Sequence, residues 1–164
     1  MRPSFSKRFK VDSKFVIASD HGGLGLKENI VNYLRSLQVD IVDLGTMNDD
    51  SVDYPDFGIK VASAVSKGEA DYGILICGTG IGMSIVANKF PGIRAALITD
   101  EFTAQMSKEH NNANIVVMGG RVLTAEQAEK MVKIWLESSY QGGRHQLRLD
   151  KIANLEDDIR SGCV

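Results

Sequence analysis

The chain has 164 residues, a formal net charge of −2 and 43% hydrophobic residues. A sequence of this length is expected to bury on the order of 70% of its unfolded surface in one domain. The slightly acidic balance argues against nucleic acid or an acidic membrane surface as partner, and no apolar run approaches the roughly 20 residues of a membrane span. We expect a single domain over residues 13–160, a flexible extension over residues 1–12 and a short tail over residues 161–164.

The two cysteines do not form a disulfide framework, because Cys77 ends an apolar run and Cys163 lies in a polar C-terminal segment. A reducing, cytoplasmic location is therefore expected. The first eight residues, with their Arg, Lys, Ser and Phe content, are also compatible with an organelle transit peptide, although a disordered extension explains them equally well.

Short β-type runs alternate with longer helical patterns, which predicts an α/β fold with a five-stranded parallel sheet and helices on both faces. The expected strands cover residues 15–19, 40–44, 72–77, 93–98 and 115–118. Apolar residues at helical spacing mark the helices, in chain order: Leu26, Ile30, Leu34 and Leu37; Phe57, Val61 and Val65; residues 85–90; Phe102 and Met106; Ala128, Val132 and Trp135.

The end of the chain shows two further signals. Thr124 with Gln127 three residues later predicts a capping box at the start of the last core helix. Gly142 and Gly143 then interrupt the chain. The polar stretch from Arg144 onward has helical composition but a weak apolar stripe, so we expect it on the surface or packed on another subunit.

The most informative feature is Cys77, which is followed by the turn Gly78-Thr79-Gly80-Ile81-Gly82. Backbone N–H groups in such a turn, with a helix N-terminus behind them, favour an anion. The same donors would stabilise the Cys77 thiolate. A small buried core cysteine is the alternative, and the glycine turn makes it less favoured.

Two other interpretations of this turn fit less well. A dinucleotide-binding fingerprint would place its third glycine differently, although Asp100 at the end of the next strand supplies an acidic residue. A cysteine phosphatase needs an arginine six positions beyond its nucleophile, and Met83 stands there.

Polar residues also follow other predicted strands, where parallel sheets hold their ligands. Asp20 and His21 follow the first strand, and Asp20 either caps the next helix or binds a ligand hydroxyl. His21 and His110, taken singly, are more often structural than catalytic. His110 lies with Asn111 in a polar connection after a helix, however, where an imidazole can exchange protons near pH 7.

Arg144 and Arg148 are four residues apart and would face the same side of a helix. Such a pair is either a solvated surface or a clamp for phosphate, and Arg121 after the fifth strand could join it. The histidines and carboxylates lack ligand-like spacing, so neither a metal site nor a cofactor is expected. A thiol, an imidazole, amide donors and an arginine clamp suit proton transfer next to the carbonyl of a phosphorylated substrate.

Several motifs, in order along residues 14–157, resemble those of the type B ribose-5-phosphate isomerases, a family that includes the galactose-6-phosphate isomerase subunits. The motifs are Ser19-Asp20-His21-Gly22-Gly23, Asp53-Tyr54-Pro55, Cys77-Gly78-Thr79-Gly80-Ile81-Gly82-Met83-Ser84, Ala87-Asn88-Lys89, His110-Asn111, and Gly142-Gly143-Arg144-His145 with Arg148. The resemblance implies a Rossmann-like three-layer sandwich, a sugar-phosphate substrate, and a homodimer or a tetramer with active sites between subunits.

By position, the resemblance also implies residue roles. Cys77 would move the proton between C2 and C1 of the open-chain sugar, and His110 would open the furanose ring, with Asn111 beside it, both from the second subunit. The remaining catalytic and substrate-binding residues would be Asp20 at the ring oxygen or hydroxyls; Gly78, Thr79, Gly80, Ile81 and Gly82 at the enediolate oxygens; and His21, Arg121, Arg144 and Arg148 around the phosphate and sugar tail.

The expected reaction is the interconversion of D-ribose 5-phosphate and D-ribulose 5-phosphate. A galactose-6-phosphate or allose-6-phosphate isomerase is the nearest alternative, because no motif specifies sugar length. A non-catalytic module that binds a nucleotide or a sugar phosphate is the alternative from another class of function.

Overall fold

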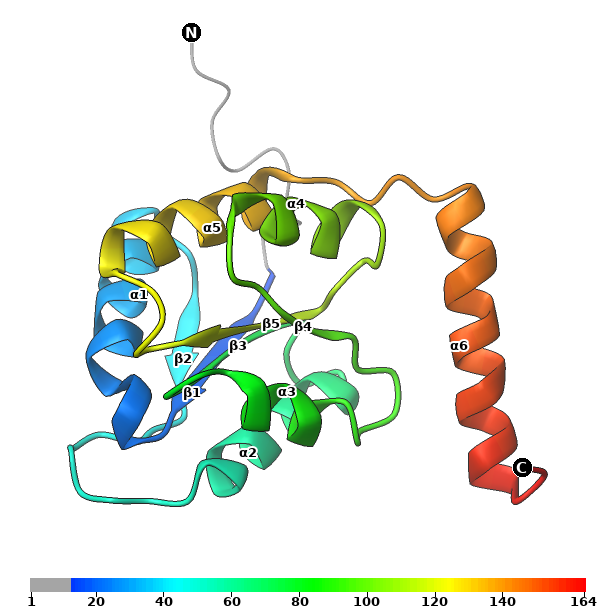
Figure 1. Cartoon of the computed structure of the whole chain (residues 1–164), viewed down its shortest axis with the longest axis horizontal. Coiled ribbons are helices and arrows are strands. Elements are labelled where there is room, and N and C mark those ends of the chain that lie inside the picture. Colours follow the sequence, from blue (N-terminus) through cyan, green and yellow to red (C-terminus); the bar gives the residue numbers. More distant parts are fainter. Residues whose placement is uncertain (1–12) are drawn as a thin grey trace, which may run out of the picture.

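The computed structural model describes residues 13–164, and it contains one five-stranded sheet between layers of helices (Figure 1). All neighbouring strands are parallel, in the order β2-β1-β3-β5-β4. The strands are β1 Phe15–Ser19, β2 Ile41–Asp43, β3 Tyr72–Cys77, β4 Ala95–Leu97 and β5 Ile115–Gly119. The predicted α/β fold is thus confirmed, whereas the predicted extension over residues 1–12 lies outside the described residues.

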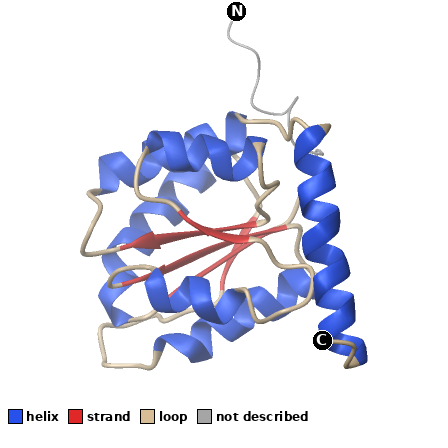
Figure 2. Ribbon diagram, turned by 45° about the vertical axis from the view of Figure 1, so that its right-hand side comes forward, coloured by secondary structure: helices blue, strands red, loops and turns tan. Residues whose placement is uncertain are grey.

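Helices cover both faces of the sheet (Figure 2). They are α1 Leu24–Ser36, α2 Tyr54–Ser66, α3 Ile81–Ala87, α4 Glu101–Glu109, α5 Ala125–Glu137 and α6 Arg144–Ser161, with a 3-10 turn, η2, at His21–Gly23. One apolar cluster fills the space between the sheet and helices α1, α4 and α5, and a second lies under α2 and α3. Ile74 and Ile76 of β3 point into the first cluster, and Leu75 and Cys77 point into the second, as the alternation of a strand requires.

The two edge strands are shorter than predicted. Residues 40–44 and 93–98 were expected to be strands, but β2 spans three residues and β4 spans three. Each pairs on one side only, with β1 or with β5, so its ladder ends sooner. The Asn88 side chain bonds to both the N–H and the C=O of Ala95, each at 2.9 Å, and so satisfies the first residue of β4.

The prediction of a helix over residues 85–90 is wrong in its bounds, because α3 begins at Ile81 and ends at Ala87. Gly80 is the N-cap residue of α3 and takes the left-handed conformation with φ of 82°, so the turn after β3 ends there and the helix begins at the next residue. Gly82 then lies inside the helix rather than in a loop. A Cβ there would meet the Tyr54 ring at 2.5 Å, so close packing accounts for this glycine.

At the end of the chain, the capping box is confirmed: Gln127 N–H donates to Thr124 Oγ1, and Thr124 N–H donates to Gln127 Oε1. Helix α6 follows the glycine pair and stands beside the body, on the side where the strands begin (Figure 1). Its Glu156 accepts the Gly92 N–H at 2.9 and 3.0 Å. Four large apolar side chains of α6 are exposed, at Leu147, Ile152, Leu155 and Ile159.

Candidate active site

Cys77 is the last residue of β3 and is 5% exposed. Its Sγ accepts a hydrogen bond from the Gly80 N–H at 3.2 Å, and its carbonyl oxygen accepts the Gly120 N–H at 2.8 Å. One side of the thiol borders the apolar cluster under α3, and the other borders the glycine turn. The sulfur therefore lies between an apolar wall and a backbone donor.

The turn after Cys77 packs tightly against neighbouring strands. A Cβ at Gly80 would lie 2.5 Å from Leu97 Cδ1 and 3.0 Å from the Met118 backbone. Thr79 is exposed, and its Oγ1 accepts the Ile81 N–H at 3.4 Å. The turn is therefore held from the sheet side, and its hydroxyl-bearing residue lies on the open side.

Asp20 lies directly beside this turn. It is 8% exposed, and its Oδ1 accepts the Gly23 N–H at 3.1 Å, so it caps the 3-10 turn η2 rather than the following helix α1, whose N-cap residue is Gly23. A Cβ at Gly22 would lie 3.3 Å from both Asp20 Oδ1 and the Gly78 nitrogen, so the carboxylate and the start of the turn both lie next to Gly22. His21 is half-buried, and its Nδ1 accepts the Val52 N–H at 3.2 Å.

Arg121, which follows β5, reaches the same place. Its N–H donates to the Gly78 carbonyl at 3.0 Å, and its Nε and Cζ lie 3.6 and 3.7 Å from the position of a Gly78 Cβ. The exposed guanidinium thus lies over the first glycine of the turn. A fixed positive charge next to backbone N–H groups favours an anionic ligand.

His110 and Asn111 lie elsewhere, at the C-terminal end of α4. The His110 ring stacks on the His145 ring, with centroids 4.1 Å apart and 11° between the planes. Arg94 Nε donates to the carbonyls of Asn111 and Asn112 at 3.1 and 3.0 Å. Desolvation, reinforced by the nearby His110 and by the arginines on the first turns of α6, lowers the pKa of His145 below its usual 6.5.

The sheet register separates the two groups of residues. Gly73 of β3 pairs with Ile115 of β5, and Cys77 pairs with Gly119. His110 precedes β5 and so lies beyond the amino ends of the strands. Cys77 lies at the carboxyl end, four residue steps or about 13 Å along the strand axis from the level of Gly73 and Ile115. In Figure 1 the arrow of β5 points away from α6.

The predicted site residues therefore form two sets in a single chain. The carboxyl edge of the sheet carries Asp20, His21, Cys77, Gly78, Thr79, Gly80, Ile81, Gly82 and Arg121, and the amino edge carries His110, Asn111, Arg144 and Arg148. Arg144 and Arg148 are exposed on the first turns of α6 and do not join Arg121. A phosphate site shared by Arg121, Arg144 and Arg148 therefore requires a second subunit, because α6 begins at the opposite edge of the sheet.

Two residues at these edges were not among the predicted site residues. His145 is 5% exposed and packs on His110. Lys27 is 1% exposed in α1, where its ammonium contacts Asp43. A signal for Lys27 was present, because it lies three and seven residues before Ile30 and Leu34 and so falls on the apolar face of the helix.

A groove of about 810 Å³ between α4 and α5 contains none of the predicted site residues. It is lined by Glu101, Phe102, Gln105, Glu109, Ile134, Glu137, Ser138 and Ser139.

Within residues 13–164, no group of three or more His, Cys, Asp or Glu side chains is placed to hold a metal ion. In the same part of the chain, no helix has the length and apolar character needed to cross a bilayer.

The all-parallel sheet defines an α/β protein, and polar residues gather at the carboxyl ends of β1, β3 and β5, the edge at which sheets of this type commonly bind ligands. Residues 15–152 match the Ribose/Galactose Isomerase family, and the chain belongs to that family of sugar isomerases. The family predicted from the sequence motifs is thus confirmed.

Individual relatives agree along most of the chain. It is 46% identical to ribose-5-phosphate isomerase B of Escherichia coli over 143 residues, which covers 87% of this chain and 96% of the relative. The structure of the Clostridium thermocellum ribose-5-phosphate isomerase B superposes with a TM-score of 0.87 at 51% identity, covering 89% and 99% of the two chains. The Mycoplasma genitalium ribose-5-phosphate isomerase B, solved with bound ribulose-5-phosphate, gives a TM-score of 0.87 at 44% identity over 90% and 98%.

Proposed function

We propose that this chain interconverts D-ribose 5-phosphate and D-ribulose 5-phosphate. The observation that carries the proposal is the Cys77 thiol, which accepts the Gly80 N–H at the carboxyl end of the central strand. The bound ribulose-5-phosphate in a relative that is 44% identical supports the choice of substrate.

The chemistry needs a base that removes the proton from C2 of the open-chain aldose and returns it to C1. Cys77 acts as this base in its thiolate form, and O2 loses a proton while O1 gains one, so both net proton transfers run from position 2 to position 1. An enediolate forms between the two transfers. Thr79 and the N–H groups of the glycine turn hold its developing negative charge, and donors of this kind are worth roughly 10²- to 10³-fold in rate each.

The active site is formed by two subunits of a homodimer. Cys77 and His110 lie at opposite edges of the sheet in one chain, so ring opening by His110 next to Cys77 requires a second copy. The exposed apolar residues Ile152, Leu155 and Ile159 recur at helical spacing on α6, which supports its packing on another subunit. A dimer with twofold symmetry gives two such sites, and pairing of dimers gives a tetramer.

The partner's α6 then completes the phosphate end of the site. Arg144 and Arg148 are exposed and one turn apart, so both guanidinium groups can contact one phosphate. Arg121 and His21 face the sugar tail and phosphate from the carboxyl edge of the first chain. Asp20 contacts the ring oxygen or the sugar hydroxyls, and Asn111 accompanies His110.

The test compares kcat/KM for ribose 5-phosphate, allose 6-phosphate and galactose 6-phosphate, with products followed by NMR in D₂O and no metal added. We expect ribose 5-phosphate to be converted most efficiently and deuterium to enter the product. A higher kcat/KM for either hexose phosphate than for ribose 5-phosphate would overturn the pentose assignment and make that hexose phosphate the substrate. Binding of all three sugars without exchange at C2 identifies a non-catalytic module and overturns the proposal.

A further inference from the structure

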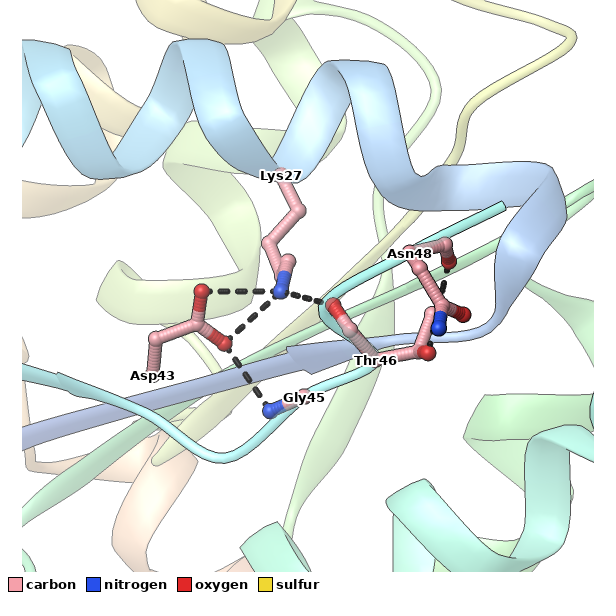
Figure 3. A network of polar contacts seen from close by, with 5 residues as sticks. All are labelled: Lys27, Asp43, Gly45, Thr46 and Asn48. Carbon is pink, nitrogen blue, oxygen red and sulfur yellow. Dashed lines mark hydrogen bonds and ion pairs between the residues drawn. The ribbon is translucent and has the colours of Figure 1, made fainter. Parts of the chain in front are cut away.

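Lys27 and Asp43 form an ion pair that the reaction chemistry does not use. Lys27 Nζ lies 2.8 Å from both Asp43 carboxylate oxygens and also donates to the Thr46 carbonyl (Figure 3). The lysine side chain is 1% exposed and the aspartate side chain 19%. A buried ion pair seldom adds stability beyond that of an apolar pair of similar size, so its presence points to what it holds in place.

The pair holds the segment that follows β2 against the end of β1. Asp43 Oδ1 accepts the Gly45 N–H at 2.9 Å, and Lys27 Nζ donates to the Thr46 carbonyl oxygen. Gly45 and Thr46 in turn bond to the backbone of Ser19. The Gly45 carbonyl accepts the Ser19 N–H, and the Thr46 N–H donates to the Ser19 carbonyl, each at 2.7 Å. Ser19 directly precedes Asp20, so the position of the Asp20 backbone depends on this segment.

The segment also reaches His21. Further along it, the Val52 N–H donates to His21 Nδ1 at 3.2 Å. A neutral imidazole that accepts at Nδ1 carries its hydrogen on Nε2, which makes Nε2 the donor. A donor at Nε2 suits an oxygen of a sugar phosphate, whereas the other tautomer presents a lone pair to it.

We propose that the Lys27–Asp43 pair is a positioning element of the substrate site. It fixes the segment over residues 43–52, which in turn sets the place of Asp20 beside Gly78 and keeps the His21 hydrogen on Nε2. The inference rests on the proposed function, because it assigns Asp20 and His21 to the sugar phosphate. Lys27 and Asp43 act through these residues and do not touch the substrate.

The experiment uses the double variant Lys27→Met/Asp43→Leu in the full chain. Removing both charges avoids an unpaired buried ion, so we expect the melting temperature to stay near that of the wild type. The loop loses its anchors on Gly45 and Thr46, however. We expect KM for ribose 5-phosphate to rise about tenfold or more with a much smaller change in kcat, the pattern of lost ground-state binding.

A second readout is independent of catalysis. In the ligand-free wild type, ¹⁵N NMR should show His21 with an unprotonated Nδ1 and a protonated Nε2, and the double variant should show a mixture of tautomers. Val132→Ala, a cavity variant in the core under α5, is the control. It lowers stability but should leave KM and the His21 tautomer unchanged.

Wild-type KM and an unchanged His21 tautomer in the double variant would overturn the positioning role. If that variant does not fold, Lys27→Met alone takes its place, because it removes the bond to the Thr46 carbonyl and the charge it leaves unpaired is Asp43, whose side chain is 19% exposed to water. If the wild type fails to isomerise ribose 5-phosphate, the proposed function is lost, and the His21 tautomer still decides whether the pair positions this residue.

Discussion

His110 and His145 stack face to face at the amino edge of the sheet, with ring centroids 4.1 Å apart. One ring ends α4 and the other lies in the first turn of α6, so the contact fixes where α6 begins relative to the body. Arg144 and Arg148 belong to the same turns of α6. The stack therefore ties the proposed ring-opening residue and the proposed phosphate clamp into one unit, and in the proposed dimer both reach the Cys77 of the other subunit together.

Mixing two inactive variants tests the shared site. Cys77→Ala and His110→Ala should each keep less than about 1% of wild-type activity on ribose 5-phosphate, as expected for the loss of a general acid or base. When the two are unfolded together and refolded, half of the dimers are mixed and each holds one intact site. Activity should then return to about one quarter of the wild-type value. No gain over the separate variants means that both residues act within one chain.

The arginines of α6 should govern substrate affinity. Arg144→Ala and Arg148→Ala remove charge-assisted hydrogen bonds to the phosphate, so each should raise KM about 10- to 100-fold with a smaller effect on kcat. Arg160→Ala is the matched control, since Arg160 is exposed near the other end of the same helix and pairs with Asp157 at 3.6 Å. A similar KM in all three variants is inconsistent with a phosphate clamp.

The lowered pKa of His145 makes stability depend on pH. Its folded pKa lies below the unfolded value of about 6.5, so the unfolded chain binds the proton more readily. The contribution of His145 is complete above pH 6.5 and is lost as the pH falls through the folded pKa. We expect the melting temperature to drop between pH 7 and pH 5, and to drop less in His145→Asn. An equal drop in both proteins assigns the acid sensitivity to other groups.

Gly80 should tolerate no side chain. Gly80→Ala combines φ of 82° with a Cβ only 2.5 Å from Leu97 Cδ1, so it should lower the free energy of unfolding by about 2 to 5 kcal/mol. Gly68→Ala is a matched control, because Gly68 has φ of 73° with nothing within 4 Å of its Cβ, and it should cost only about 1 to 2 kcal/mol. Urea denaturation measures both, and equal losses would show that packing at the turn is unimportant.

Local patterns predicted much of this fold. Residues 15–19 and 72–77 are strands with the expected bounds, and the Thr124 capping box formed as predicted, since each depends on neighbouring residues. The start of α3 was missed because the ring of Tyr54, distant in sequence, is what makes glycine necessary at position 82. The contact of Lys27 with Asp43 likewise depends on how α1 crosses the end of β2.

The site shows the same division. The sequence placed Asp20, Cys77 and Arg121 after strands, and the parallel sheet brings the three to one edge. The residue pattern alone did not separate His110 from them, and only the family resemblance assigned it to a second subunit, because a motif carries no information on which edge of the sheet its loop occupies. The strand order and the path of α6 decide that, and both are set by packing across the whole chain.

The account depends most on proton transfer by Cys77. The direct measurement follows deuterium from D₂O into ribose 5-phosphate and ribulose 5-phosphate by NMR for the wild type, Cys77→Ala and Cys163→Ala, the last as a control at an exposed cysteine. We predict label at C2 of the aldose and C1 of the ketose with the wild type and with Cys163→Ala. We predict none with Cys77→Ala, which should still bind ribulose 5-phosphate. Label entering at the wild-type rate with Cys77→Ala would contradict the account.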